Sequence, residues 1–215
     1  MLGFLRKDFY MLYGAYKKNL LLVFLLYAAL VLVMKNTFLL AILIWLMAFY
    51  GLSAITMDDS CGWDRYARTL PVSSGAVITA RFLTILLLLG VAVAYSLILG
   101  GILHLFLDYD GIGDLLLTIA LVTSAALATT GILLPAAYKW GVDKVRNTFM
   151  LVFILVFLTP VLLKKWLGTG LTDSLLRWLE ELSPTALSAA ALGVGLLVFA
   201  LGGWVSARIY AKKEF

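Results

Sequence analysis

The chain has 215 residues, of which 63% are hydrophobic and only 13% are charged, and its formal net charge is +5. Its mean hydropathy is +1.03, whereas apolar residues make up roughly half of a typical water-soluble domain. The composition therefore predicts a membrane protein and leaves no room for a separate soluble domain. The basic residues lie beside apolar segments rather than in one cluster, so they indicate orientation in a membrane and not nucleic-acid binding.

Six apolar segments contain no Asp, Glu, Lys or Arg, and each predicts a membrane span. They are residues 20–33, 37–57, 82–107, 115–138, 148–163 and 186–205. Backbone groups must be paired in hydrocarbon, and the alternating pattern of a membrane barrel is missing, so the spans are expected to be helices. We predict an all-α, polytopic membrane protein with one transmembrane domain, residues 1–215. The first and fifth segments are short for a span.

The distribution of Lys and Arg predicts the orientation. The amino-terminal segment, residues 58–81, residues 139–147 and the carboxyl-terminal tail together hold thirteen Lys and Arg, whereas the alternate loops hold four. Positively charged residues collect on the cytoplasmic side of membrane proteins. We therefore expect both termini and residues 58–81 to be cytoplasmic.

Two further segments have the pattern of amphipathic helices. In residues 1–18 the apolar positions at helical spacing are Leu2, Leu5, Phe9, Leu12, Tyr13 and Tyr16. Such a helix lies along an anionic leaflet, although a helical lead-in to the first span fits the pattern nearly as well. Residues 172–182 carry leucines on one stripe and acidic residues on others, which predicts an external amphipathic helix.

Ionisable groups are nearly missing from the predicted spans. Apart from tyrosines and the single cysteine, Cys61, they contain only His104, near an outer end. Ion-driven pumps usually bury Asp, Glu, Lys or Arg among their helices because these groups bind the coupling ion, so the sequence argues against a pump. We expect His104 to be a wetted surface residue. One cysteine also excludes an internal disulfide and a cysteine-based metal site.

Catalytic and nucleotide-binding motifs are missing as well. The sequence has no HExxH, GxSxG or GxxxxGK[ST], so we expect this chain to hydrolyse no nucleotide by itself and to take its energy from a partner. One enzymatic alternative stays open. Asp58, Asp59 and Asp64 could form a divalent-metal site like that of an enzyme that works on lipid headgroups. Arg65 and Arg68 beside them favour ion pairing instead.

The stretch between the second and third spans predicts a short helix at residues 62–70, bracketed by Gly62 and Pro71. Its aromatic stripe consists of Trp63, Tyr66 and Leu70. Asp64 and Arg68 lie four residues apart and can pair. Trp, Tyr and Arg often anchor protein interfaces, which favours a docking site for a partner; an aromatic belt at headgroup depth is the simpler alternative.

The sequence CGWDRYARTLPVSSGAVITARF resembles the corresponding cytoplasmic segment of type-2 (ABC-2) ABC transporter permeases, particularly small subunits similar to phenol-soluble modulin and bacteriocin-type peptide exporters. The matching residues are Gly62, Trp63, Asp64, Arg65, Tyr66, Ala67, Leu70, Pro71, Val72 and Ser73. The chain departs from the pattern at Ser74 and Gly75, where the family often carries a basic residue. In outline the resemblance covers the whole chain.

In such permeases the matching segment is a coupling helix that docks in a groove of the ATPase subunit. The resemblance therefore implies an ATPase contact through Gly62, Trp63, Asp64, Arg65, Tyr66, Arg68, Leu70 and Pro71. It also implies a unit of two permeases, identical or different, and two ATPases in the lipids of a bacterial plasma membrane. ATP and magnesium then belong to the ATPase, and this chain binds no cofactor and no metal.

We therefore predict the permease subunit of an ATP-driven exporter. A pathway without buried charges suits amphipathic peptides or lipid-like molecules better than ions or sugars, so we expect export of amphipathic peptides or toxins. The sequence assigns no substrate-binding residues. Two other functions stay open, namely the headgroup enzyme described above and a passive membrane anchor for a soluble partner.

Overall fold

The computed structural model describes residues 2–34, 38–106, 112–141, 144–145 and 183–212, and the regular structure of these residues is entirely helical. Five of their helices are long and apolar enough to cross a membrane. They are α1 (Leu2–Met34), α2 (Phe38–Cys61), α4 (Ser74–Phe106), α5 (Ile112–Trp140) and α7 (Pro184–Lys212). The chain is therefore an all-α, multi-pass membrane protein.

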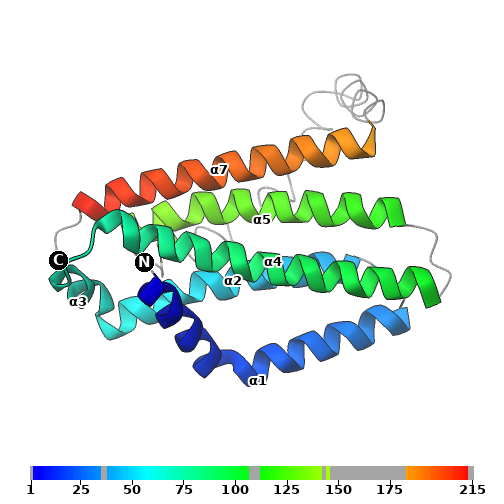
Figure 1. The fold of residues 1–215 in the computed structure, drawn as a ribbon, viewed down its shortest axis with the longest axis horizontal. Helices are drawn as coiled ribbons and strands as arrows, with labels where there is room; N and C mark the ends of the chain where they lie inside the picture. The colour runs from blue at the N-terminus through cyan, green and yellow to red at the C-terminus, as the bar shows by residue number, and fades with distance from the viewer. Residues whose placement is uncertain (1, 35–37, 107–111, 142–143, 146–182, 213–215) are drawn as a thin grey trace.

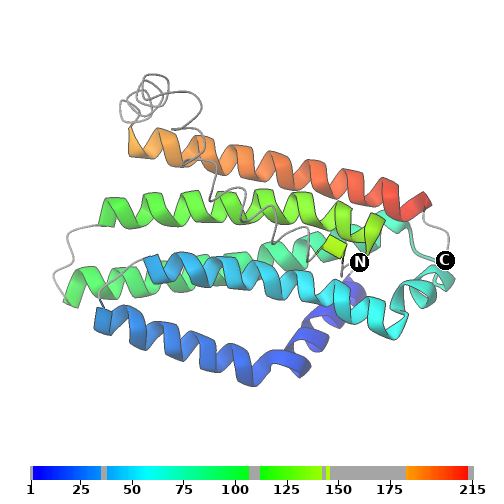
Figure 2. The same cartoon turned by 180° about the vertical axis from the view of Figure 1, so that it is seen from behind.

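The long helices run side by side, and the short helix α3 (Trp63–Thr69) lies at one end of them (Figure 1). Helix α5 packs most extensively on α7, α2 packs on α4 and α5, and α1 packs on α4 and α2. The start of α1 and the end of α7 lie at the same end as α3, as the view from behind also shows (Figure 2). We call this the α3 end. The side of the membrane on which it lies stays a prediction.

Small residues bring the backbones of α5 and α7 into contact. A Cβ atom placed on Gly202 would lie 2.0 Å from the carbonyl oxygen of Gly131, and one on Gly195 would lie 2.8 Å from Ser124. The Ser124 hydroxyl donates a hydrogen bond to the Ala191 carbonyl at 2.5 Å. Glycine permits such close approach between membrane helices, so these two helices form a tightly packed pair.

Helix α1 is continuous from Leu2 to Met34, which agrees with the predicted alternative of a helical lead-in to the first span and differs from a separate interfacial helix. The helix bends in its amino-terminal half (Figure 1). Its buried residues include Asp8 and Leu12, while Leu2 and Tyr13 of the predicted apolar stripe are 76% and 64% exposed. The amino-terminal segment packs against the other helices through a partly polar face, which an apolar pattern does not reveal.

The other described helices extend beyond the predicted spans because charged residues do not end them. Helix α2 continues through Asp58 to Cys61, and α4 begins before Arg81, at Ser74. The predicted span 148–163 and the predicted external helix 172–182 lie outside the described residues.

Candidate functional site

Helix α3 is set off from α2 by one glycine. Gly62 has φ 67° and ψ 23°, the left-handed conformation that glycine adopts without steric cost. Its N–H donates to the Asp59 carbonyl at 3.3 Å, so α2 stops at Cys61 and α3 starts at Trp63 in a new direction. Leu70 ends α3 in an extended conformation, as expected for a residue before proline.

Tyr66 places an aromatic ring on the exposed side of α3. Tyr66 is 56% exposed, whereas Ala67 is only 2% exposed and faces the protein. Gly62 and Pro71, on either side of the helix, are also exposed. The side chains of Asp64, Arg65 and Arg68 lie outside the described part, so the predicted pairing of Asp64 with Arg68 stays a prediction.

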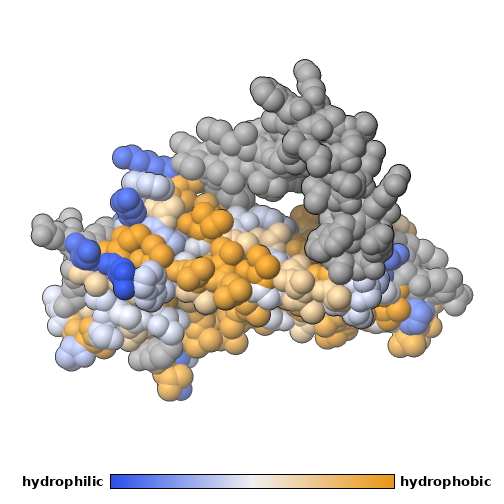
Figure 3. Space-filling view, turned by 90° about the horizontal axis from the view of Figure 1, so that it is seen from above, coloured by the Kyte–Doolittle hydropathy of each residue, from blue (hydrophilic) through white to orange (hydrophobic). Residues whose placement is uncertain are grey.

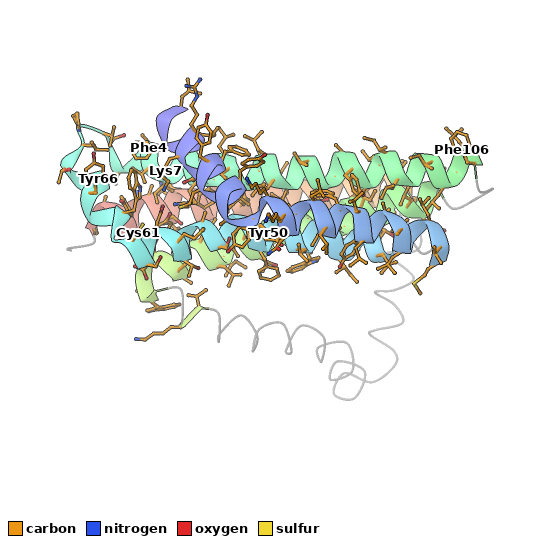
Figure 4. The ribbon with its side chains drawn as sticks, turned by 90° about the horizontal axis from the view of Figure 1, so that it is seen from below. Phe4, Lys7, Tyr50, Cys61, Tyr66 and Phe106 are labelled. Carbon is orange, nitrogen blue, oxygen red and sulfur yellow. The ribbon has the colours of Figure 1, made fainter. Side chains whose placement is uncertain are left out.

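Trp63 joins α3 to the amino-terminal segment of α1. Its ring lies 5.3 Å from the ring of Tyr66 and 6.4 Å from that of Phe4, between ring centroids. The Lys7 Nζ atom lies 4.6 Å from the centroid of the Trp63 ring, a distance at which a cation is attracted to the ring. Figure 4 shows Phe4, Lys7 and Tyr66 gathered at the α3 end.

A surface hollow of about 200 Å³ lies in this contact. Its lining consists of Gly3, Phe4, Lys7, Trp63 and Leu70. The hollow is formed jointly by α1, by α3 and by the residue after α3. The α3 end therefore offers a partner an aromatic surface with a shallow depression in it.

Directly behind Trp63, four charged side chains form one cluster, which we call the ion cluster: Lys7, Asp8, Asp58 and Arg81. The Lys7 Nζ atom lies 2.6 and 2.7 Å from the two carboxylate oxygens of Asp58, and 3.0 Å from Asp8. Arg81 contacts Asp8 at 3.0 Å and also donates a hydrogen bond to Asp58.

The ion cluster is charge-balanced and largely shielded from solvent. Asp8, Asp58 and Arg81 are only 2%, 3% and 5% exposed, while the Lys7 side chain is 21% exposed. Buried charges are tolerated when they are paired and hydrogen-bonded, and two acids with two bases satisfy that condition. Thr84 adds a hydrogen bond to Asp8 at 3.3 Å.

The ion cluster connects most of the bundle. Lys7 and Asp8 belong to α1, Asp58 to α2 and Arg81 to α4. Lys7 contacts both Trp63 and Asp58. Direct contacts therefore link α3 to α1, and α1 to α2 and α4.

Charged side chains outside the predicted spans are buried, which the apolar pattern of the sequence did not indicate. Asp8, Asp58 and Arg81 are buried in helices long and apolar enough to cross a membrane. The spans had been delimited by charge-free runs, which places every charge outside them by definition. Part of the cluster could have been located from the sequence. Asp58 precedes α3 and Arg81 follows it, so a hairpin between α2 and α4 brings the two side chains together. His104 itself is exposed.

Two of the three acidic residues of the metal site that was left open, Asp58 and Asp59, have described side chains, and these two do not share a site. Asp58 is engaged by Lys7 and Arg81, and Asp59 is exposed. Within the part of the chain that the structure describes, no group of three His, Cys, Asp or Glu side chains is placed to hold a metal ion. The described partners of Asp58 are Lys7 and Arg81, whereas pairing by Arg65 and Arg68 stays a prediction because their side chains lie outside the described part.

The described residues thus form a helical membrane protein with an exposed tyrosine and a buried ion cluster at the α3 end. Comparison with protein families matches residues 3–211 to the family described as ABC-2 family transporter protein. Because the match covers nearly the whole chain, this chain belongs to that family. The comparisons with curated proteins and with solved structures found no match.

Membership of the ABC-2 family makes the chain a membrane transport component, and it implies an ABC ATPase as partner. The prediction of an ABC-2 permease from the residues around Trp63 is confirmed at this level. The narrower similarity to phenol-soluble modulin and bacteriocin-type exporters stays a prediction.

Proposed function

We propose that this chain is the permease subunit of an exporter, and that its ATPase docks on α3 through Gly62, Trp63, Asp64, Arg65, Tyr66, Arg68, Leu70 and Pro71. The observation that supports this most is the exposed aromatic side of α3 at the end of the bundle, where Trp63 is held by α1. An aromatic belt at headgroup depth needs neither the left-handed glycine that redirects the chain nor a contact with a buried ion cluster.

The proposed mechanism is mechanical. ATP and magnesium bind to the ATPase subunit, whose closure pushes on α3. Trp63 passes the displacement to Lys7, which is paired with Asp58 of α2. Arg81, which is paired with Asp58, passes the displacement on to α4. The working unit contains two ATPases and two permeases, in a bacterial plasma membrane with both termini cytoplasmic.

Six spans complete the proposed architecture. Helix α5 ends at the α3 end and α7 begins at the opposite end (Figure 1). The proposal places one crossing between these two ends, in residues 148–163, the one apolar segment in between that is free of charged residues. This supports the predicted span there.

The proposed substrate class is amphipathic peptides or toxins. The argument for it changes in one respect, because charges do lie among the helices. They pair with one another at the α3 end, whereas the other buried residues that the structure describes are mostly apolar, with a few serines and threonines and no charge. Such surroundings favour apolar or amphipathic molecules. Transport of labelled amphipathic peptide and labelled lipid into vesicles with the complex tests this. Movement of lipid alone, or of neither, would contradict it.

The docking proposal is tested by replacing both aromatic residues of α3. Trp63→Ala with Tyr66→Ala should reduce co-purification of the ATPase at least tenfold and uncouple ATP hydrolysis from export, because aromatic anchors carry much of the binding energy at interfaces. Both are measured on the co-expressed, purified complex. Insertion of the chain into the membrane should be unchanged.

Phe106→Ala is the matched control. Phe106 is 77% exposed and lies at the opposite end of α4 (Figure 4), so its loss should leave ATPase binding unchanged. Normal co-purification and transport in the Trp63 and Tyr66 variant would refute docking on α3. If the partner's position at the membrane depended on this chain but no substrate moved in wild type, a passive anchor would be the better explanation.

A further inference from the structure

A second hollow, of about 330 Å³, lies between α4 and α7 near the α3 end. Residues of α4 and α7 line it, namely Ile78, Thr79, Phe82, Phe199, Ala200, Gly203, Trp204 and Ala207. Almost all of this lining is apolar, and the small residues at 200, 203 and 207 make the groove. Its volume reaches the lower limit of ordinary ligand sites, about 300 Å³.

The groove has an apolar end, and a cationic side chain outside its lining stacks on Trp204 beside the other end. The rings of Phe82 and Phe199, 4.8 Å apart between centroids, lie at the end farther from α3. At the other end the Arg208 guanidinium lies 3.6 Å from the centroid of the Trp204 ring. Trp204 is 55% exposed, and Arg208 is also exposed and has no carboxylate partner among the residues that the structure describes.

The position along α7 places Arg208 at the membrane surface. The 29 residues of α7 correspond to about 44 Å of helix, and the hydrocarbon core of a bilayer is about 30 Å thick. A centred helix therefore projects about 7 Å at each end. Arg208 lies four residues before the end of α7 at Lys212, about 6 Å along the axis, whereas Phe199 lies well inside the core.

We propose that this groove binds an anionic phospholipid of the leaflet at the α3 end, with its phosphate at Arg208 and an acyl chain along Gly203 toward Phe82 and Phe199. Charge complementarity selects the headgroup, since a guanidinium binds phosphate through paired donors. The space-filling view from above shows the apolar surface of this side bordered by hydrophilic residues toward the α3 end (Figure 3). The inference depends on the membrane-spanning fold and not on the docking of an ATPase.

The test measures lipid retained on the purified full chain by native mass spectrometry, after exposure to mixed micelles of phosphatidylglycerol or phosphatidylcholine with identical chains. Wild type should retain phosphatidylglycerol preferentially. Arg208→Gln should lower that preference about fivefold, the factor that corresponds to about 1 kcal/mol for one basic residue at an anionic surface. Lys17→Gln, at another exposed cation stacked on an aromatic ring, is the matched control and should change little.

A second variant fills the groove. A Cβ atom on Gly203 would meet only the Phe82 ring at 3.5 Å, so Gly203→Leu fits the backbone and should lower retention of both lipids. Gly90→Leu, at an exposed glycine of α4 with open space around it, should have no effect. Helix content by circular dichroism checks folding, and Ala207→Leu replaces Gly203→Leu if that variant misfolds.

Three results would overturn the proposal. The first is equal retention of the two lipids by wild type, or unchanged retention in both variants. The second is full displacement of phosphatidylglycerol by inorganic phosphate, which would make Arg208 a plain anion site. The third is a change of oligomeric state in Gly203→Leu without a change in lipid, which would assign the groove to a second copy of the chain.

Discussion

The α5–α7 pair and the junction of α1, α2 and α4 are held together by opposite means. Glycine and serine bring α5 and α7 into backbone contact, with Gly202 against Gly131. The junction instead depends on four buried charged groups and on the ring of Trp63. Close backbone packing has one good geometry, whereas ion pairs can exchange partners within a cluster. We therefore expect α5–α7 to act as a rigid unit and the junction to be the part that moves.

The largest effect is expected from breaking the ion cluster on one side. Asp58→Leu leaves Lys7 and Arg81 without their shared carboxylate, and loss of one partner of a buried pair costs about 3 to 5 kcal/mol. Thermal unfolding of the purified chain in detergent should show this loss of stability. An unchanged unfolding temperature would mean that the cluster is solvated and does not join the helices.

Removing an acid and a base together distinguishes an effect on the stability of the fold from an effect on the coupling of ATP hydrolysis to export. In the Asp58→Leu, Arg81→Leu double variant, Lys7 and Asp8 still balance each other at 3.0 Å, and replacement of a buried pair by apolar residues is often neutral. Stability should therefore recover most of what Asp58→Leu loses, while ATP hydrolysis and export stay uncoupled. Recovery of both would show that the cluster is only structural.

An intermediate effect is expected from separating α5 and α7. A Cβ atom on Gly202 would overlap the Gly131 carbonyl, so Gly202→Ala should cost about 1 to 3 kcal/mol, as overpacking generally does. Gly193→Ala, where a Cβ atom meets nothing within 4 Å, is the control. Equal unfolding temperatures of the two variants would contradict the close packing.

The smallest effects concern single interhelical hydrogen bonds, one in each region. Tyr95 of α4 donates to the Phe24 carbonyl of α1 at 2.5 Å, and Ser124 of α5 donates to Ala191 of α7. Tyr95→Phe and Ser124→Ala should each cost about 0.6 kcal/mol, the average measured for such bonds in membranes. A change of transport in Tyr95→Phe but not in Ser124→Ala would support the distinction between a moving and a rigid region.

The membrane class, the helical fold and the family followed from the sequence because apolar runs and the residues around Trp63 are local signals. The short helix was located from Gly62 and Pro71 for the same reason, and the structure has a helix between them. The ion cluster could not be found in this way, since Lys7, Asp58 and Arg81 come from segments far apart in the chain. Their pairing becomes visible only when α1 is packed against α2 and α4.

Cys61 gives the most direct test of the central claim, because it is the one cysteine of the chain, it is exposed, and only Gly62 separates it from α3. A photoactivatable maleimide on Cys61 of the assembled, co-expressed complex should cross-link to the ATPase, identified by peptides that contain its Walker motifs. The same reagent on the Cys61→Ser, Phe106→Cys variant, labelled at the opposite end of the bundle, should not. Cross-linking of the ATPase from position 106 and not from Cys61 would contradict the account.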